Sequence, residues 1–155
     1  MEKLILELTA NARDLNLIDN IYEIDLEYHD PMLSIRGRKN MKTYFSNLNK
    51  MTPLFEVELT QVVSQEDTYV AIWNAEVAFK IGDRFESPIV SYPGSTIIKF
   101  THGNAKVRYH RDYYDQSAAY AEIPLVKHIF GFLEDQMLKQ ATKNMDKEAI
   151  SKGIQ

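Results

Sequence analysis

Six ionisable side chains and three tyrosines fall within ten residues, Lys106 to Asp115, which read KVRYHRDYYD. This stretch follows a turn signal at His102-Gly103-Asn104 and is predicted to form a β-strand, whose side chains alternate between two faces. One face is expected to carry Arg108, His110, Asp112 and Tyr114. The opposite face is expected to carry Val107, Tyr109, Arg111 and Tyr113. A carboxylate and an imidazole on one face are the groups that general acid–base catalysis uses.

A second set of candidate residues lies on the predicted strand Tyr69 to Ile81. One of its faces carries Val70, Ile72, Asn74, Glu76 and Ala78. Glu76 therefore lies among apolar neighbours, where desolvation raises the pKa of a carboxyl group, which then either finds a partner or transfers protons. Glu76 and Asp112 are predicted to form an acid–base pair. The alternative is that Arg108, His110 and Tyr114 satisfy these carboxylates in a polar pocket lining without catalysis.

Composition excludes several other classes of chemistry. The chain contains no cysteine, and its four histidines show no metal-ligand spacing, so we expect no cofactor and no metal. A net charge of −4 without any basic cluster argues against nucleic acid as a partner. No apolar run is long enough to span a membrane, and the N-terminal MEKLILELTANARD is too polar for a signal peptide. We therefore expect a cytoplasmic protein.

The elements that must hold these residues are predicted from hydrophobic periodicity. Helical spacing is expected over Glu2 to Asn11, from the N-cap Asp14 through Tyr22, and again after Gly37. From Leu54 the period changes to two, which predicts a series of strands with a hairpin turn at Gly82-Asp83. These strands are placed at Leu54 to Thr60, Tyr69 to Ile81, Ile89 to Tyr92, Ser95 to Phe100 and Lys106 to Tyr114.

A terminal helix is predicted from Pro124, with an apolar stripe between Leu125 and Met137 that is expected to pack on its own domain. The chain is read as a single domain over 1–142, followed by a polar tail over 143–155. The predicted fold class is α+β, with a mostly antiparallel sheet covered on one face by N-terminal helices and completed by a C-terminal helix.

Two motifs give the sequence a specific resemblance. The first is Asp14 followed by Tyr28-His29-Asp30-Pro31 and then Gly37-Arg38, and the second is Lys106-Val107 leading to Arg111-Asp112-Tyr113-Tyr114-Asp115. In this order they resemble the nuclear-transport-factor-2-like superfamily, a cone-shaped fold shared by SnoaL-like polyketide cyclases, ketosteroid isomerases and limonene-epoxide hydrolases. The fold hosts many functions, so the resemblance alone implies no single reaction.

The resemblance implies where the candidate residues lie. In the resembling folds the last strand directs the side chain at the Asp112 position into the cone, which would bring His110 and Tyr114 inside with it. By the same analogy, the face with Ile72, Asn74 and Glu76 would also point inward. Tyr109 and Tyr113 would then face the outer side of the sheet, where the superfamily commonly forms homodimers.

Three chemistries can be compared with these positions. A ketosteroid isomerase would use Asp30 as its proton shuttle, yet Leu6 and Thr96 stand where the resemblance places the two oxyanion donors, so Tyr92 or Tyr114 would have to substitute. An Asp before proline also commonly caps a turn, which is the simpler reading of Asp30. A limonene-type hydrolase would use Asp112 and Glu76, but Asn74 replaces the bridging arginine unless Arg108 reaches in.

SnoaL-type cyclases require less, mainly one acid or base in a shaped cavity, and this role suits Asp112 with His110. Two hypotheses result. The first is a pocket protein for an apolar cyclic small molecule, in which Asp112, His110, Glu76 and Asp30 act as acids or bases. The second is a dimeric binding or interaction module without catalysis.

Overall fold

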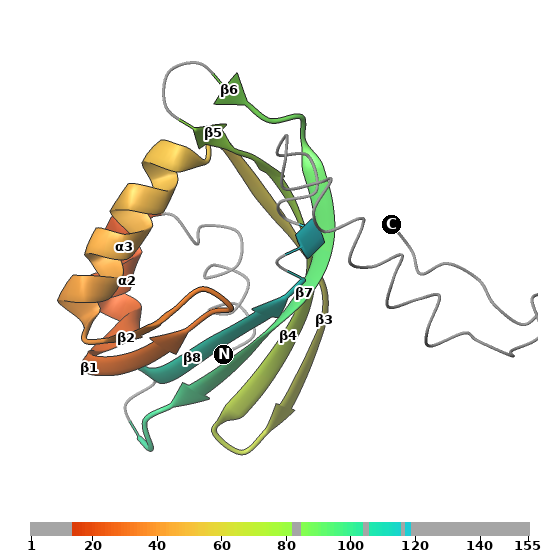
Figure 1. The fold of residues 1–155 in the computed structure, drawn as a ribbon. Coiled ribbons are helices and arrows are strands. Elements are labelled where there is room, and N and C mark those ends of the chain that lie inside the picture. The colour runs from red at the N-terminus through yellow and green to blue at the C-terminus, as the bar shows by residue number, and fades with distance from the viewer. Residues whose placement is uncertain (1–13, 82–84, 104–105, 116, 119–155) are drawn as a thin grey trace, which may run out of the picture.

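The computed structural model describes residues 14–81, 85–103, 106–115 and 117–118. Two helices, α2 (Leu15–Ile21) and α3 (Arg38–Met51), stand against one face of a strongly curved sheet (Figure 1). The sheet has six strands in the order β2-β1-β8-β7-β4-β3. Their bounds are β2 Ser34–Arg36, β1 Tyr22–His29, β8 Val107–Tyr114, β7 Val90–Phe100, β4 Thr68–Ala78 and β3 Leu54–Gln65.

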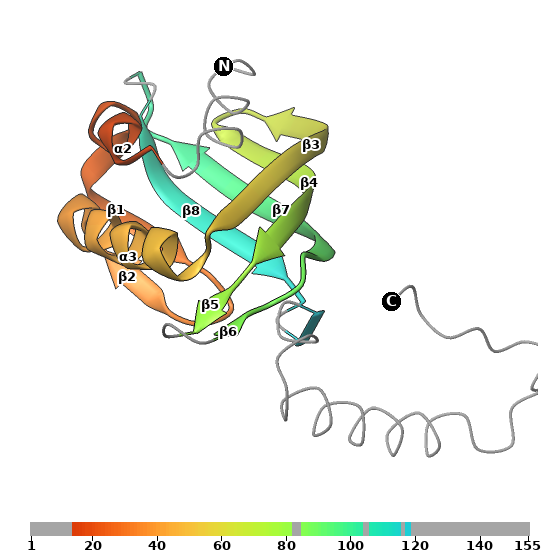
Figure 2. The ribbon, with the colours of Figure 1, turned by 90° about the horizontal axis from the view of Figure 1, so that it is seen from above.

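The pairing of the strands is antiparallel except at one place. β1 runs parallel to β8, and a separate two-stranded ribbon joins β5 (Lys80–Ile81) to β6 (Phe85–Glu86). Seen from above, α2 and α3 lie on the concave side of the curved sheet (Figure 2). The prediction of an α+β fold with helices over a curved, mostly antiparallel sheet is confirmed.

Helix α2 ends one residue earlier than predicted, because the chain continues directly into strand β1. Asp14 caps α2 as expected, its carboxylate accepting a hydrogen bond from the Asn16 amide at 2.8 Å. The helix stops at Ile21, and β1 begins at Tyr22, which the sequence interpretation had assigned to the helix. The sequence YEIDLEYH alternates apolar and acidic residues, and this period of two is the strand signal that the interpretation missed.

The helix predicted after Gly37 is present as α3. Gly37 adopts a φ of 90°, a conformation that glycine tolerates without steric cost, and it opens the helix. The apolar positions predicted from the i, i+3, i+4, i+7 spacing all face inward. They are Met41, Tyr44, Phe45 and Leu48.

The predicted strands are present, with three differences of more than one residue in their bounds. β3 extends to Gln65 rather than Thr60, and β4 ends at Ala78 rather than Ile81. Ile89 to Tyr92 and Ser95 to Phe100 were expected to be two strands, but β7 runs without interruption through Pro93-Gly94. Gly94 pairs with both Trp73 and Tyr114 in the ladder. A Cβ at Gly94 would lie 2.2 Å from the Trp73 ring. The absence of a side chain at Gly94 therefore lets the Trp73 indole pack against the neighbouring strand.

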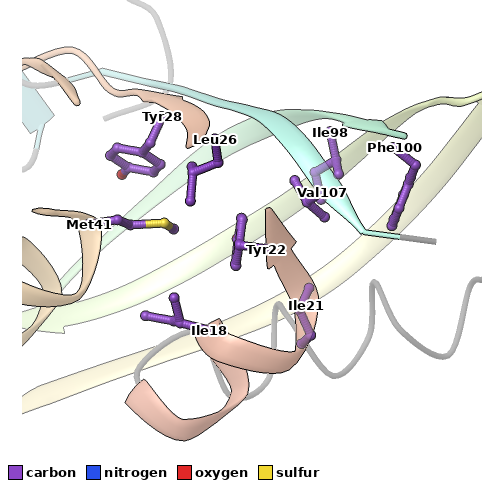
Figure 3. Packing of buried hydrophobic residues seen from close by; sticks show 9 residues of the cluster. All are labelled: Ile18, Ile21, Tyr22, Leu26, Tyr28, Met41, Ile98, Phe100 and Val107. Atoms are coloured by element: carbon purple, nitrogen blue, oxygen red, sulfur yellow. The ribbon is translucent and has the colours of Figure 1, made fainter. Parts of the chain in front are cut away.

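The main core lies between the helices and the curved sheet. Side chains from α2, β1, α3 and the ends of β7 and β8 meet there (Figure 3). The buried set comprises Ile18, Ile21, Tyr22, Leu26, Tyr28, Met41, Ile98, Phe100 and Val107. Val107 was expected on the outer face, but an irregularity between Lys99 and Phe100 in the β7–β8 pairing brings it into the core.

Several predicted features lie outside the described residues. These are the helix over Glu2 to Asn11, the Gly82-Asp83 turn, the helix from Pro124 and the polar tail 143–155. The single-domain boundaries therefore stay a prediction. In the part of the chain that the structure describes, no helix has the length and apolar character that a membrane span requires.

Candidate functional site

A cavity of about 160 Å³ lies between the concave side of the sheet and helices α2 and α3. Its wall is mainly apolar and aromatic. The apolar part includes Leu17, Ile18, Met41, Phe45, Leu48, Phe55, Val57, Trp73, Val77 and Ile98. The volume is comparable to that of an engineered cavity of about 150 Å³ that binds benzene. The space therefore suits a ligand with one or two small rings.

A chain of three hydrogen-bonded side chains crosses the polar wall of the cavity. His110 Nε2 lies 2.9 Å from Asp112 Oδ1, and His110 Nδ1 lies 2.7 Å from the Tyr22 hydroxyl. The two residues of β8 share a face because they are two positions apart, while Tyr22 enters from the start of β1. Both side chains of the pair are largely shielded, with 12% of His110 and 17% of Asp112 exposed. Asp112 and His110 thus form a preorganised pair at the cavity wall.

Asp112 accepts two further hydrogen bonds from hydroxyl groups. Thr96 donates to Oδ1 at 2.6 Å, and Tyr28 donates to Oδ2 at 3.0 Å. Burial of Asp112 raises its pKa, but the charge and hydrogen bond of His110 and the Thr96 and Tyr28 bonds outweigh this effect, so the pKa lies below 3.8. Asp112 is therefore a carboxylate at neutral pH.

Asp30 forms a second anionic group beside the first. Its Oδ1 accepts hydrogen bonds from the amides of Met32 at 2.7 Å and Leu33 at 2.9 Å, which hold the turn after β1. Its Oδ2 accepts from the hydroxyls of Tyr44 at 2.5 Å and Tyr28 at 3.3 Å. Asp30 thus both caps the turn and presents one oxygen to the cavity wall.

The hydroxyl of Tyr28 lies between the two carboxylates. It has one proton to donate, so at any moment it serves either Asp112 or Asp30. Burial, followed by the nearby charges of Asp112 and Asp30, raises the pKa of Tyr28 well above 10. Burial and the Asp112 charge raise the pKa of Tyr22 in the same direction. Both phenols therefore keep their protons. Tyr28 acts as a donor, whereas the direction of the Tyr22–His110 bond depends on the tautomer of the imidazole.

The opposite part of the cavity is aromatic. The rings of Trp73, Tyr92 and Tyr114 contact one another, with centroids 5.6 to 6.4 Å apart. The Trp73 indole N–H donates to Thr96 Oγ1 at 2.8 Å, and the same hydroxyl donates to Asp112. The Thr96 hydroxyl therefore connects the aromatic part of the cavity wall with the carboxylate of Asp112.

Four of the predicted site residues lie elsewhere. Glu76, Asn74 and Ile72 were expected inside, but they are exposed on the outer face of β4, and the inner face is formed by Ala71, Trp73, Ala75 and Val77. The expectation relied on counting back from the Gly82 turn. Val77 and Ala78 are both buried, so the alternation breaks before that turn and the count selects the wrong face.

Arg108 also lies outside the cavity. Its side chain is half exposed, and it contacts Asp67 at 3.3 Å and the carbonyl of Phe100 at 3.1 Å. The cause is the irregular pairing at this end of β8, which separates Arg108 from the inward face of His110 and Asp112. Thr96, Tyr114, His110, Asp112 and Asp30 all line the cavity.

Sequence reasoning missed the four aromatic donors Tyr22, Tyr28, Tyr44 and Trp73. The alternation in β1 could have placed Tyr22 and Tyr28 on one inward face, and the i, i+3 spacing from Met41 could have added Tyr44. For Trp73, the signal was that the odd positions of β4 are apolar throughout. Among the described residues, no group of three His, Asp or Glu side chains could hold a metal ion.

Fold and site together define an α+β protein with an apolar cavity between a curved sheet and two helices, and with ionisable groups on one wall. The family model of the SnoaL-like domain matches residues 5–110. The chain therefore belongs to the SnoaL-like family, whose members bind small molecules.

Solved structures with the same fold come from several bacteria. A proposed SnoaL-like polyketide cyclase from Jannaschia sp. CCS1 has a TM-score of 0.68 at 16% identity, covering 79% of this chain and 90% of that one. AclR from Streptomyces galilaeus, a proposed hydroxylase, has a TM-score of 0.64 at 17% identity, covering 92% and 96%.

A phenazine biosynthesis-related protein from Pseudomonas aeruginosa has a TM-score of 0.67 at 10% identity, covering 79% and 83%. At these identities the similarity shows the fold alone. No curated protein matches the sequence.

Proposed function

We propose that the protein binds an apolar cyclic small molecule in the cavity and transfers a proton to or from it, with Asp112 and His110 as the acid–base pair. The observation that carries the proposal is the Asp112–His110 hydrogen bond of 2.9 Å at the wall of a mainly apolar cavity. A pocket of this kind, with a few convergent polar groups, is the usual setting of a small-molecule site.

The reaction we propose begins with removal of a proton from a carbon next to a carbonyl group. Asp112 would accept this proton as the base, and the product would be an enol or enolate. Asp112 already accepts three hydrogen bonds, so one of them has to yield. The Tyr28 bond is the replaceable one, because its hydroxyl can turn from Asp112 to Asp30 and leave Oδ2 to the substrate.

The second half of the reaction returns the proton from Asp112 to the carbon that lost it, or to another carbon of the enol. Once Tyr28 donates to Asp30, the Tyr44 hydroxyl can turn from Asp30 to a substrate oxygen that gains negative charge. His110, held by Tyr22, would share the proton gained by Asp112 and stabilise the intermediate state. General acid–base catalysis of this kind contributes about 10²- to 10⁴-fold to a rate.

A proton-exchange experiment tests the proposal. Trp73 is the only tryptophan, so its indole N–H signal reports binding at the cavity wall directly. We would titrate the bicyclic ketone 2-tetralone and related one- and two-ring ketones, and then follow exchange of their α-protons in D₂O by NMR. We expect binding to shift the Trp73 signal and the wild-type protein to accelerate exchange.

The variants decide between catalysis and mere binding. Asp112→Asn should abolish the acceleration and leave the Trp73 titration nearly unchanged, whereas the exposed Asp115→Asn should behave as wild type. Exchange that continues at the wild-type rate in Asp112→Asn would reject the catalytic role. Binding without any accelerated exchange would favour the second hypothesis, a binding protein without turnover.

We also propose that the outer face of the sheet forms a homodimer contact. Tyr113, Ile72 and Val63 are 43%, 39% and 51% exposed there, and Tyr109 shares that face. Exposed apolar groups gathered on one face are typical of an interaction surface. Replacing Tyr109 and Tyr113 with glutamate should shift the protein to a monomer in sedimentation, and a variant that sediments as the wild type would contradict the contact.

A further inference from the structure

Carboxylates outnumber basic side chains along the described cavity wall, where His110 is the single basic group. The described residues that line the cavity include the carboxylates Asp14, Asp30 and Asp112, and no Lys or Arg is among them. From the charge and the aromatic surface of this wall, we infer that the preferred ligand is a small aromatic or alicyclic compound that carries an amino group, bound as its ammonium ion. The inference rests on the proposed function of the cavity and names the class of ligand that it takes.

Asp30 contributes most to this selectivity because, among the described residues, its hydrogen-bond partners are all neutral groups. Its described partners are two backbone amides and the hydroxyls of Tyr28 and Tyr44. Such bonds stabilise a carboxylate without neutralising it, so the negative charge acts on whatever enters the cavity. Asp112 differs, since His110 can offset its charge when the imidazole is protonated.

Five of the described cations have partners outside the lining of the cavity. Arg38 and Lys42 contact Asp19, and Arg108 contacts Asp67. On the outer face of the sheet, Lys99 lies over the Tyr109 ring and Arg111 over the Tyr113 ring. Arg111 also borders a second, more open pocket beside Asp30 and Asp112, but no described Lys or Arg lines the cavity itself.

The aromatic surface strengthens the same preference. Tyr28 and Tyr44 lie with ring centroids 6.0 Å apart beside Asp30, and Trp73 lines the other part of the cavity. The face of an aromatic ring attracts a cation, most strongly where water is excluded. An ammonium group near Asp30 would therefore meet both a carboxylate and ring faces, whereas a carboxylate ligand would be repelled and would find no Lys or Arg among the described lining residues.

Three ligands of nearly equal shape and different charge test the inference. We would titrate benzylammonium, benzyl alcohol and benzoate into the full-length protein at pH 7 and follow the Trp73 indole signal. We expect benzylammonium to bind at least about tenfold more tightly than benzyl alcohol, and benzoate to bind most weakly.

Two variants locate the effect. Asp30→Asn keeps the Oδ1 acceptor of the turn and removes the charge, so benzylammonium should fall to the affinity of benzyl alcohol. Glu58→Gln changes the net charge by the same amount on the exposed face of β3, and should keep the preference for the cation.

The outcomes separate the inference from the proposed function. If benzoate binds as tightly as benzylammonium in the wild-type protein, the inference is wrong while the cavity remains a ligand site. If none of the three probes moves the Trp73 signal and the ketones also fail to bind, both the inference and the proposed function fail. The wild-type order of affinities decides the matter even where a variant does not fold.

Discussion

Thr96 holds two functional groups at once, and its replacement by valine gives the most direct test of the site geometry. Its buried hydroxyl accepts the Trp73 indole N–H at 2.8 Å and donates to Asp112 at 2.6 Å. Valine has almost the same shape but neither donates nor accepts a hydrogen bond. The change therefore removes both bonds without opening a large cavity.

The expected cost follows from the two bonds. A buried donor left without a partner costs about 1–3 kcal/mol, and a lost hydrogen bond to a charged group costs about 1.5–3 kcal/mol. Asp112 keeps two other partners and some access to water, so we expect a total near 3 kcal/mol rather than the sum of the upper limits. For a domain of this size, the Tm should fall by roughly 6–12 °C.

Urea unfolding followed by Trp73 fluorescence measures this loss. Thr60→Val is the matched control, since the exposed Thr60 hydroxyl donates one hydrogen bond, to the backbone oxygen of Ile72, and the change should cost less than about 1 kcal/mol. In Thr96→Val the indole N–H of Trp73 is left without its acceptor, and adding Trp73→Phe removes this N–H. Unfolding of variants without the tryptophan is followed by circular dichroism. The double variant should therefore be less destabilised than the sum of the singles, by about 1–2 kcal/mol. If Thr96→Val costs no more than Thr60→Val, the hydroxyl does not carry the role that its contacts indicate.

Three other predictions concern the same cavity. Because the pKa of folded Asp112 lies below 3.8, its ionised form contributes stability that is fully present above the unfolded pKa and is lost as the pH falls through the folded value. The stability difference between the wild type and Asp112→Asn should thus shrink as the pH is lowered below about 4, and a difference that grows there would contradict the sign. Gly94→Ala should displace the Trp73 ring into the cavity and weaken ketone binding at least about tenfold, which the Trp73 indole signal would report. Glu76→Gln should leave α-proton exchange at the wild-type rate, because Glu76 is exposed on the outer face, and a large loss of rate would restore the sequence interpretation.

The hydrogen bonds around Asp112 have a consequence for any reaction in this cavity. They make the carboxylate a weaker base than an isolated one, since every donor stabilises the ionised form. Its advantage is position, because the same donors hold the oxygen atoms in place before a ligand arrives. Tyr28 is the donor that can move, and its two acceptors are therefore central to the proposed reaction.

Local patterns in the sequence determined much of this protein. The i, i+3, i+4, i+7 spacing gave the inward face of α3, and the alternation in KVRYHRDYYD put His110 and Asp112 on one side of β8. The sequence also predicted that Asp14 caps the N-terminus of α2. These features depend on neighbours within a few residues, where a helical or strand period sets the direction of each side chain.

Only the tertiary structure decided which face of each strand points inward and which side chains meet. The outward direction of Glu76 follows from the pairing of β4 with β3 and β7, and irregular pairing at the end of β8 carries Arg108 out and Val107 in. The contacts of Asp112 with Tyr28, and of His110 with Tyr22, span 84 and 88 residues. They arise from the parallel pairing of β1 with β8, a long-range arrangement that no local period encodes.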